Sequence, residues 1–209
     1  MGERIGTLVL GIGNILWADE GFGVRAVEAL HRQYRFPDSV VLVDGGTQGL
    51  YLLPYVQAAR RMLVFDAIDY GLAPGTLKVI RDGEIPAYLG IYKMSLHQSS
   101  FQEVLSLATL SGARPETALL IGVQPEDLTD FGGSLRDSVK ARLPEALQIA
   151  LSVLDEWGVA GVPRNGSAAD TLSAPKLAID GYEEGRPVES EACRVGDSRF
   201  LRLRAGRTG

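Results

Sequence analysis

The sequence predicts an α/β fold: a three-layer sandwich in which a mainly parallel, twisted central sheet carries helices on both faces. Two observations lead to this prediction. Short apolar runs alternate along the chain with longer stretches whose apolar residues recur at helical spacing. Strands and helices that alternate in this way form βαβ units, which build parallel sheets. With 209 residues, of which 45% are hydrophobic, the chain is long enough to bury a sizeable core.

The expected elements follow from the apolar patterns in chain order. We expect strands at 7–11, 40–43, 62–65, 76–80 and 118–123. We expect helices at 21–32, 50–59, 98–110 and 134–157. Pro144 lies inside the last of these and is expected to start or kink that helix, because proline lacks an N–H.

The composition changes after Gly158. Residues 1–158 are predicted to form a single α/β domain. Residues 159–209 are rich in glycine, proline, serine and charged residues and show no sustained periodicity. We therefore expect a C-terminal extension that is flexible or loosely docked.

Charge and cysteine content exclude several classes of function. The formal net charge of −5 argues against a nucleic-acid partner, because phosphate binding requires a basic face. Cys193 is the single cysteine, which fits a reducing compartment and excludes a site built from several cysteines. The N-terminal apolar run is too short for a signal peptide, and no apolar stretch is long enough to span a membrane. We expect a cytoplasmic protein with no membrane association.

Acidic residues follow three of the predicted strands. Asp19 and Glu20 come shortly after the first strand, Asp44 ends the second, and Asp66 ends the third. Parallel neighbouring strands would bring these carboxylates to one edge of the sheet, where they repel one another unless a cation or shared proton is present. Each also has a structural explanation, because Asp19 or Glu20 could cap the next helix and Asp44 could belong to a turn. Their shared location favours function.

The sequence contains two histidines, and His97 is the candidate for chemistry. Ser95 and Gln98 have the spacing of a capping box, which places His97 in the first turn of a helix. The positive end of the helix dipole there favours the neutral imidazole, the form that binds metals. One imidazole with two or more carboxylates is a suitable set for nickel, zinc or iron. A purely structural histidine remains the alternative.

Two other kinds of site fit the sequence less well. Gly11 and Gly13 follow the first strand, as in a dinucleotide-binding loop, but Leu16 replaces the third glycine of that motif. The nearby carboxylates of Asp19 and Glu20 would repel a phosphate. There is no GxSxG motif, and Cys193 lies far in sequence from both histidines, which disfavours a serine or cysteine hydrolase.

Several segments of the chain resemble hydrogenase maturation endopeptidases and occur in the same order as in that family. The chain's opening, the DGGT and DAID motifs, and the SxHQ motif are specific in combination, and together the matching segments cover most of residues 6–158. They read LVLGIGNILWADEGFGVRAVEAL, VLVDGGTQGLYLL, VFDAIDYGLAPGTLKVI, MSLHQSSFQEVL and IGVQPEDL. The C-terminal extension resembles that of members serving uptake hydrogenases.

The resemblance implies an activity and a set of residues. Such enzymes remove a C-terminal extension from the large-subunit precursor of a nickel–iron hydrogenase after nickel insertion. Their metal-binding and catalytic residues match Glu20, Asp66 and His97, and the nickel is carried by the substrate. The implied protease is aspartic-type or metal-assisted. A self-contained zinc metallopeptidase and a nickel-sensing chaperone without proteolytic activity remain alternatives, and the role of Asp44 stays unassigned.

Overall fold

A five-stranded sheet forms the centre of the protein. The computed structural model describes residues 4–85, 96–165, 172 and 175–185. The strands lie in the order β3-β1-β4-β6-β5, and all pairs are parallel except β5 with β6. Their bounds are β1 (Ile5–Ile12), β3 (Val40–Gly46), β4 (Ala59–Ala67), β5 (Leu77–Arg81) and β6 (Thr117–Val123). The predicted mainly parallel sheet is confirmed, and the antiparallel strand at its edge is β5.

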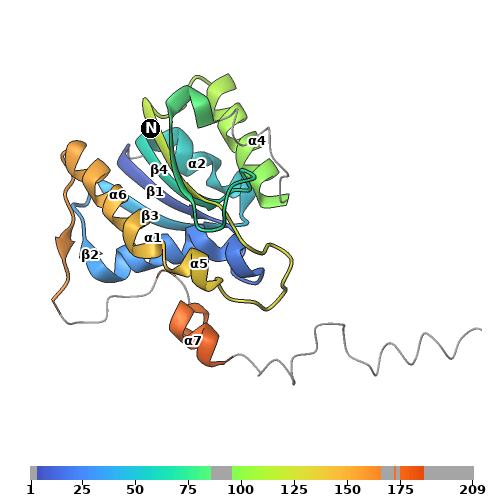
Figure 1. Cartoon of the computed structure of the whole chain (residues 1–209). Coiled ribbons are helices and arrows are strands. Elements are labelled where there is room, and N and C mark those ends of the chain that lie inside the picture. The colour runs from blue at the N-terminus through green and yellow to red at the C-terminus, as the bar shows by residue number, and fades with distance from the viewer. Residues whose placement is uncertain (1–3, 86–95, 166–171, 173–174, 186–209) are drawn as a thin grey trace, which may run out of the picture.

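Helices cover both faces of this sheet, as Figure 1 shows. One face carries α1 (Phe22–Gln33) and α6 (Leu143–Glu156), and the other carries α2 (Leu53–Ala58) and α4 (Leu96–Leu110). Side chains alternate between the two faces along each strand. Val9 and Phe65 pack under α1 and α6, whereas their neighbours Leu10 and Val64 pack under α2 and α4. Both faces are apolar, which is why the strands appear in the sequence as continuous apolar runs.

Helix α1 approaches the sheet unusually closely. A Cβ atom on Gly23 would lie 2.2 Å from the carbonyl oxygens of Ile12 and Phe65, and a Cβ on Gly11 would lie 2.3 Å from the carbonyl oxygen of Gly23. Glycine is therefore required on both sides of this contact. The first turn of α1 rests on the carboxyl ends of β1 and β4. The short 3-10 helix η1 (Ala18–Gly21) directly precedes it.

The helix expected at 50–59 is divided in the structure. A 3-10 helix, η2 (Gly49–Leu52), leads into α2, and Pro54 lies in the first turn of α2, where a missing N–H costs nothing. Ala59 already belongs to β4. Both β3 and β4 extend a few residues beyond the predicted apolar runs, so that Asp44 lies inside β3 and Asp66 lies inside β4.

The single long helix expected at 134–157 is wrong. The chain forms α5 (Asp137–Lys140) and then, after a break at Ala141 and Arg142, α6. Pro144 lies in the first turn of α6, so it starts this helix rather than kinking it. Ser134 and Leu135 instead belong to the connection between β6 and α5, where both are buried.

The described residues after Gly158 contact the first helix. β7 (Val162–Pro163) pairs with β2 (Tyr34–Arg35) at the end of α1. Next come η4 (Pro175–Leu177) and α7 (Ile179–Glu184), which lies below α1 and α5 in Figure 1. The buried guanidinium of Arg25 donates a hydrogen bond to the carbonyl oxygen of Leu177 and lies 5.5 Å from the centre of the Tyr182 ring. Residues 186–209, part of the predicted extension, lie outside the described residues.

The contact between α1 and the sheet leads to a first prediction. Gly23→Ala should lower the free energy of unfolding by about 2–3 kcal/mol, because the added methyl group meets backbone oxygens that cannot move independently of β1 and β4. Urea unfolding measures this loss. Gly83→Ala is the matched control, because a Cβ at Gly83 meets nothing within 4 Å. Equal unfolding midpoints for the two variants would contradict the close packing.

Candidate functional site at the carboxyl edge of the sheet

Asp66 lies near the carboxyl end of β4, the central strand of the five-stranded sheet, with parallel neighbours on both sides. It is 1% exposed, and its Oδ1 accepts a hydrogen bond of 2.8 Å from the backbone N–H of Ala67. Phe65 and Ala67 both face α1 and α6, so strand alternation directs Asp66 toward the opposite face, under α2 and α4. The buried carboxylate is thus on the side of the sheet that α4 covers.

His97 begins the helix on that same side. It is the second residue of α4, which agrees with the prediction that it lies in a first turn. Helix α4 has 15 residues and spans about 22 Å. It precedes β6, whose 7 residues span about 23 Å. Because α4 ends beside the start of β6, its first turn reaches the carboxyl edge of the sheet. The side chain of His97, and Ser95, which is predicted to cap the helix, lie outside the described part of the chain.

Glu20 approaches the edge from the other side. It lies in η1 and is half-buried. The contact of Gly23 with the carbonyl oxygens of Ile12 and Phe65 holds the start of α1, directly after η1, against the residue that precedes Asp66 in β4. A Cβ on Gly13 would lie 1.8 Å from the carbonyl oxygen of Glu20. Gly11 and Gly13 therefore make room for the backbone of η1 and α1. This packing explains the two glycines without a phosphate-binding loop.

Asp44 lies at the same edge, on β3. It pairs with Gly11 of β1, and its half-buried side chain lies near the tight turn at Gly46. The carbonyl oxygen of Asp44 accepts a hydrogen bond of 2.9 Å from the Gln48 side chain. The structure brings Glu20, Asp44 and Asp66 to one edge, together with the helix turn that carries His97.

The neighbouring acidic residues Asp19 and Glu20 have different surroundings. Asp19 is fully buried. Its Oδ2 accepts hydrogen bonds from the backbone N–H groups of Glu126 and Asp127, and its Oδ1 accepts one from Arg136, at 2.7–2.9 Å. The sequence allows either residue as a helix cap, but in the structure Asp19 holds the connection between β6 and α5. Ala18, just before it, has a left-handed backbone conformation with φ of 38°, which is strained for a residue other than glycine.

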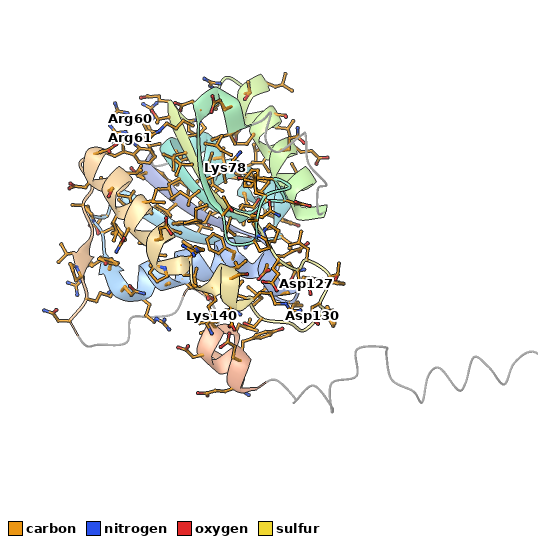
Figure 2. The ribbon with its side chains drawn as sticks, viewed as in Figure 1. Arg60, Arg61, Lys78, Asp127, Asp130 and Lys140 are labelled. Atoms are coloured by element: carbon orange, nitrogen blue, oxygen red, sulfur yellow. The ribbon has the colours of Figure 1, made fainter. Side chains whose placement is uncertain are left out.

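An ion-pair group fixes the far side of that connection. Arg136 donates hydrogen bonds to Asp127 at 2.6 Å and to Asp130 at 3.0 Å, and Figure 2 labels both aspartates. The hydrogen bond from Arg136, followed by that from the Thr129 backbone, lowers the pKa of Asp127 from 3.8 to about 2. The same pair raises the pKa of Arg136. This group does not follow from the sequence, because its partners come together only once the loop is folded.

Gln124 is a second buried polar side chain that the sequence did not single out. It is 5% exposed. Its Oε1 accepts hydrogen bonds from the backbone N–H groups of Tyr70 and Leu72, at 2.7 and 3.1 Å, and its Nε2 donates to Asp69. The connection after β4 is therefore tied to the end of β6, beside Asp66. A polar residue directly after an apolar strand was the available signal.

The described residues show no metal centre at the acidic edge. Their side chains include no group of three histidine, cysteine, aspartate or glutamate residues placed to hold a metal ion, and the imidazole of His97 is not among them. A cavity of about 470 Å³ lies between α1, α6 and the segment after Gly158, away from the acidic edge.

Among the described residues, no helix is long and apolar enough to cross a bilayer.

Three comparisons relate the chain to known proteins. A family model described as hydrogenase maturation protease matches residues 24–153. The hydrogenase expression/formation protein HoxM of Azotobacter vinelandii is 60% identical over 194 residues, 93% of each chain. HupM of Azotobacter chroococcum is 58% identical and covers 96% of this chain and 95% of its own. The structure of the hydrogenase maturating endopeptidase HybD from E. coli matches with a TM-score of 0.72 and 42% identity, over 76% of this chain and 98% of its own.

The fold is that of an α/β protein whose parallel strands carry acidic residues at their carboxyl ends, where sheets of this kind bind ligands. With these similarities, the chain belongs to the hydrogenase maturation protease family. It is therefore a hydrolase, a protease that acts in hydrogenase maturation. The match to HybD covers 98% of HybD but only 76% of this chain. HoxM and HupM match this chain over more than 90% of its length, so this chain shares with them a region that HybD lacks.

The buried Asp19 provides a second prediction. Asp19→Asn should lower the free energy of unfolding by about 1–3 kcal/mol, because an amide offers one oxygen where two carboxylate oxygens serve three backbone donors. Urea denaturation measures the change. Asp38→Asn on the exposed connection before β3 is the control. A variant as stable as this control would exclude Asp19 as the anchor of the loop.

The lowered pKa of Asp127 gives a third prediction, on acid stability. A carboxyl whose folded-state pKa is depressed stabilises the fold above its unfolded pKa, and this contribution is lost as pH falls from about 4 toward 2. At pH 6 the free energy of unfolding of wild type should exceed that of Asp127→Asn by about 1 kcal/mol. The value is modest because solvent screens the partly exposed ion pair. The difference should shrink at pH 3. An equal difference at both pH values, measured by urea unfolding, would contradict the assignment.

Proposed function

We propose that this protein removes the C-terminal extension of a nickel–iron hydrogenase large-subunit precursor after nickel insertion, and that it recognises the bound nickel through Glu20, Asp66 and His97. The observation that carries the proposal is convergence. β4, η1 and α4 each bring one of these residues to the same edge of the sheet. The family relationship supplies the class of reaction.

The residue types suit nickel held by the substrate. Carboxylate oxygens and an imidazole nitrogen are accepted ligands of divalent transition metals, and three protein ligands leave positions for those of the precursor. Asp66 is buried and oriented by the N–H of Ala67. His97 lies where the helix dipole favours the neutral imidazole. Completing the nickel coordination would dock the precursor with its scissile peptide at this edge.

The chemistry then requires a water molecule to attack the scissile carbonyl. In an aspartic-type reaction, Asp66 takes a proton from this water as general base, and the amide nitrogen leaves with a proton as the C–N bond breaks. In a metal-assisted reaction, the substrate nickel polarises the carbonyl or the water. In both cases the carboxylates hold the nickel, and their charge favours a cation at the edge.

Mass spectrometry of the precursor, incubated with this protein with and without prior nickel loading, tests the proposal. Loss of a C-terminal peptide only from the nickel-loaded precursor is the expected result. Cleavage of both forms would favour a self-contained metallopeptidase instead. Binding without any mass change would favour a nickel-sensing chaperone.

The role of His97 gives a fourth prediction. His97→Ala should reduce cleavage of the nickel-loaded precursor by about 100-fold or more, because one of three nickel-facing groups is lost. Circular dichroism should show an unchanged fold. His31→Ala, which removes the other histidine from the later part of α1, is the matched control and should cut normally. Normal processing of the hydrogenase in cells that carry His97→Ala would refute the assignment.

A further inference from the structure

Large apolar side chains are exposed on the connections that leave the carboxyl ends of the parallel strands. Among the described residues, one or more such side chains follow each of β1, β3, β4 and β6, and they are Leu16, Leu50, Tyr51, Leu72 and Phe131. Burial of these groups does not stabilise this chain. Exposed apolar groups gathered at one edge mark a contact surface.

Two of these residues, Leu16 and Phe131, form a fixed patch with the half-buried Trp17. The Trp17 and Phe131 rings meet edge to face, with centroids 5.2 Å apart and an interplanar angle of 62°. Their backbones form a β-bridge, and the N–H of Gly132 donates a hydrogen bond of 2.7 Å to the carbonyl oxygen of Leu16. Phe131 is nevertheless 61% exposed. The patch joins the connection after β1 to the connection after β6.

The patch is held rigidly beside the acidic edge. Trp17 directly precedes η1, which carries Glu20. Asp19 in η1 accepts the hydrogen bonds from Glu126, Asp127 and Arg136 that hold the connection bearing Phe131. Rings that are already fixed lose little conformational freedom when a partner covers them. Fixed aromatic side chains are the kind that contribute most to protein–protein binding.

We propose that the Leu16–Trp17–Phe131 patch binds an apolar segment of the precursor large subunit next to the scissile peptide. The inference rests on the proposed function, since a protein substrate cut at the acidic edge must cover the connections around that edge. The connection that carries Phe131 also carries the paired charges of Asp127, Asp130 and Arg136, and polar residues next to an apolar patch are typical of an interface. The patch strengthens binding of the precursor and positions its scissile peptide, and the nickel-facing residues distinguish a nickel-loaded precursor from an empty one.

The fifth prediction tests this surface with Phe131→Ser. The ring is mostly exposed, so the thermal unfolding midpoint should remain near that of wild type. The Kd for the nickel-loaded precursor, and the KM for its cleavage, should rise by about tenfold or more, with kcat nearly unchanged. Leu110→Ser is the matched control, because Leu110 is 83% exposed at the far end of α4 and should bind the precursor normally.

Binding and cleavage are measured separately so that the two proposals can be told apart. Wild-type protein that captures the precursor without cutting it would contradict the proposed mechanism, while Phe131→Ser would still test the patch by capture. A Kd for Phe131→Ser equal to that of wild type would overturn the patch. So would sedimentation showing that wild type self-associates and Phe131→Ser does not, since the patch would then bind a second copy.

Discussion

The close contact between α1 and the carboxyl ends of β1 and β4 is the constraint on which the site depends. Gly11 and Gly23 leave no space for side chains between the helix and the strands. This contact fixes η1, and with it Glu20, at the level of Asp66. A larger residue at either glycine would lift the helix and change the distance between carboxylates on two different elements. Packing of backbone against backbone thus determines a geometry that is used for chemistry.

Buried polar side chains then hold the connections that surround the site. Asp19 fastens the connection after β6, and Gln124 fastens the connection after β4. Each satisfies several backbone N–H groups that a loop would otherwise leave without protein partners. The result is a rigid edge in which acidic residues can be kept close despite their repulsion. The same rigidity holds the exposed Phe131 and Trp17 rings in place.

The segment after Gly158 extends this organisation to the far side of α1. Arg25 is buried between Glu28, the carbonyl oxygen of Leu177 and the Tyr182 ring. Glu183 accepts hydrogen bonds from Ser134 and Lys140, which flank Arg136 in sequence. Residues expected to form a loosely docked extension therefore contact both the helix and the connection that frame the site. HoxM and HupM are similar to this chain over nearly its whole length, including this region.

Local patterns in the sequence predict the succession of strands and helices, the acidic residues at strand ends and the helix turn that carries His97. These features follow from periodicity and from residues adjacent in the chain. The sequence motifs also led to the family that the comparisons confirm. Tertiary structure alone separated Asp19, a buried anchor, from Glu20 beside it. It also divided the expected helix at 134–157 and exposed the ring of Phe131. The hydrogen-bond partners of Asp19 lie more than 100 residues away in the sequence, and burial depends on such distant contacts rather than on local pattern.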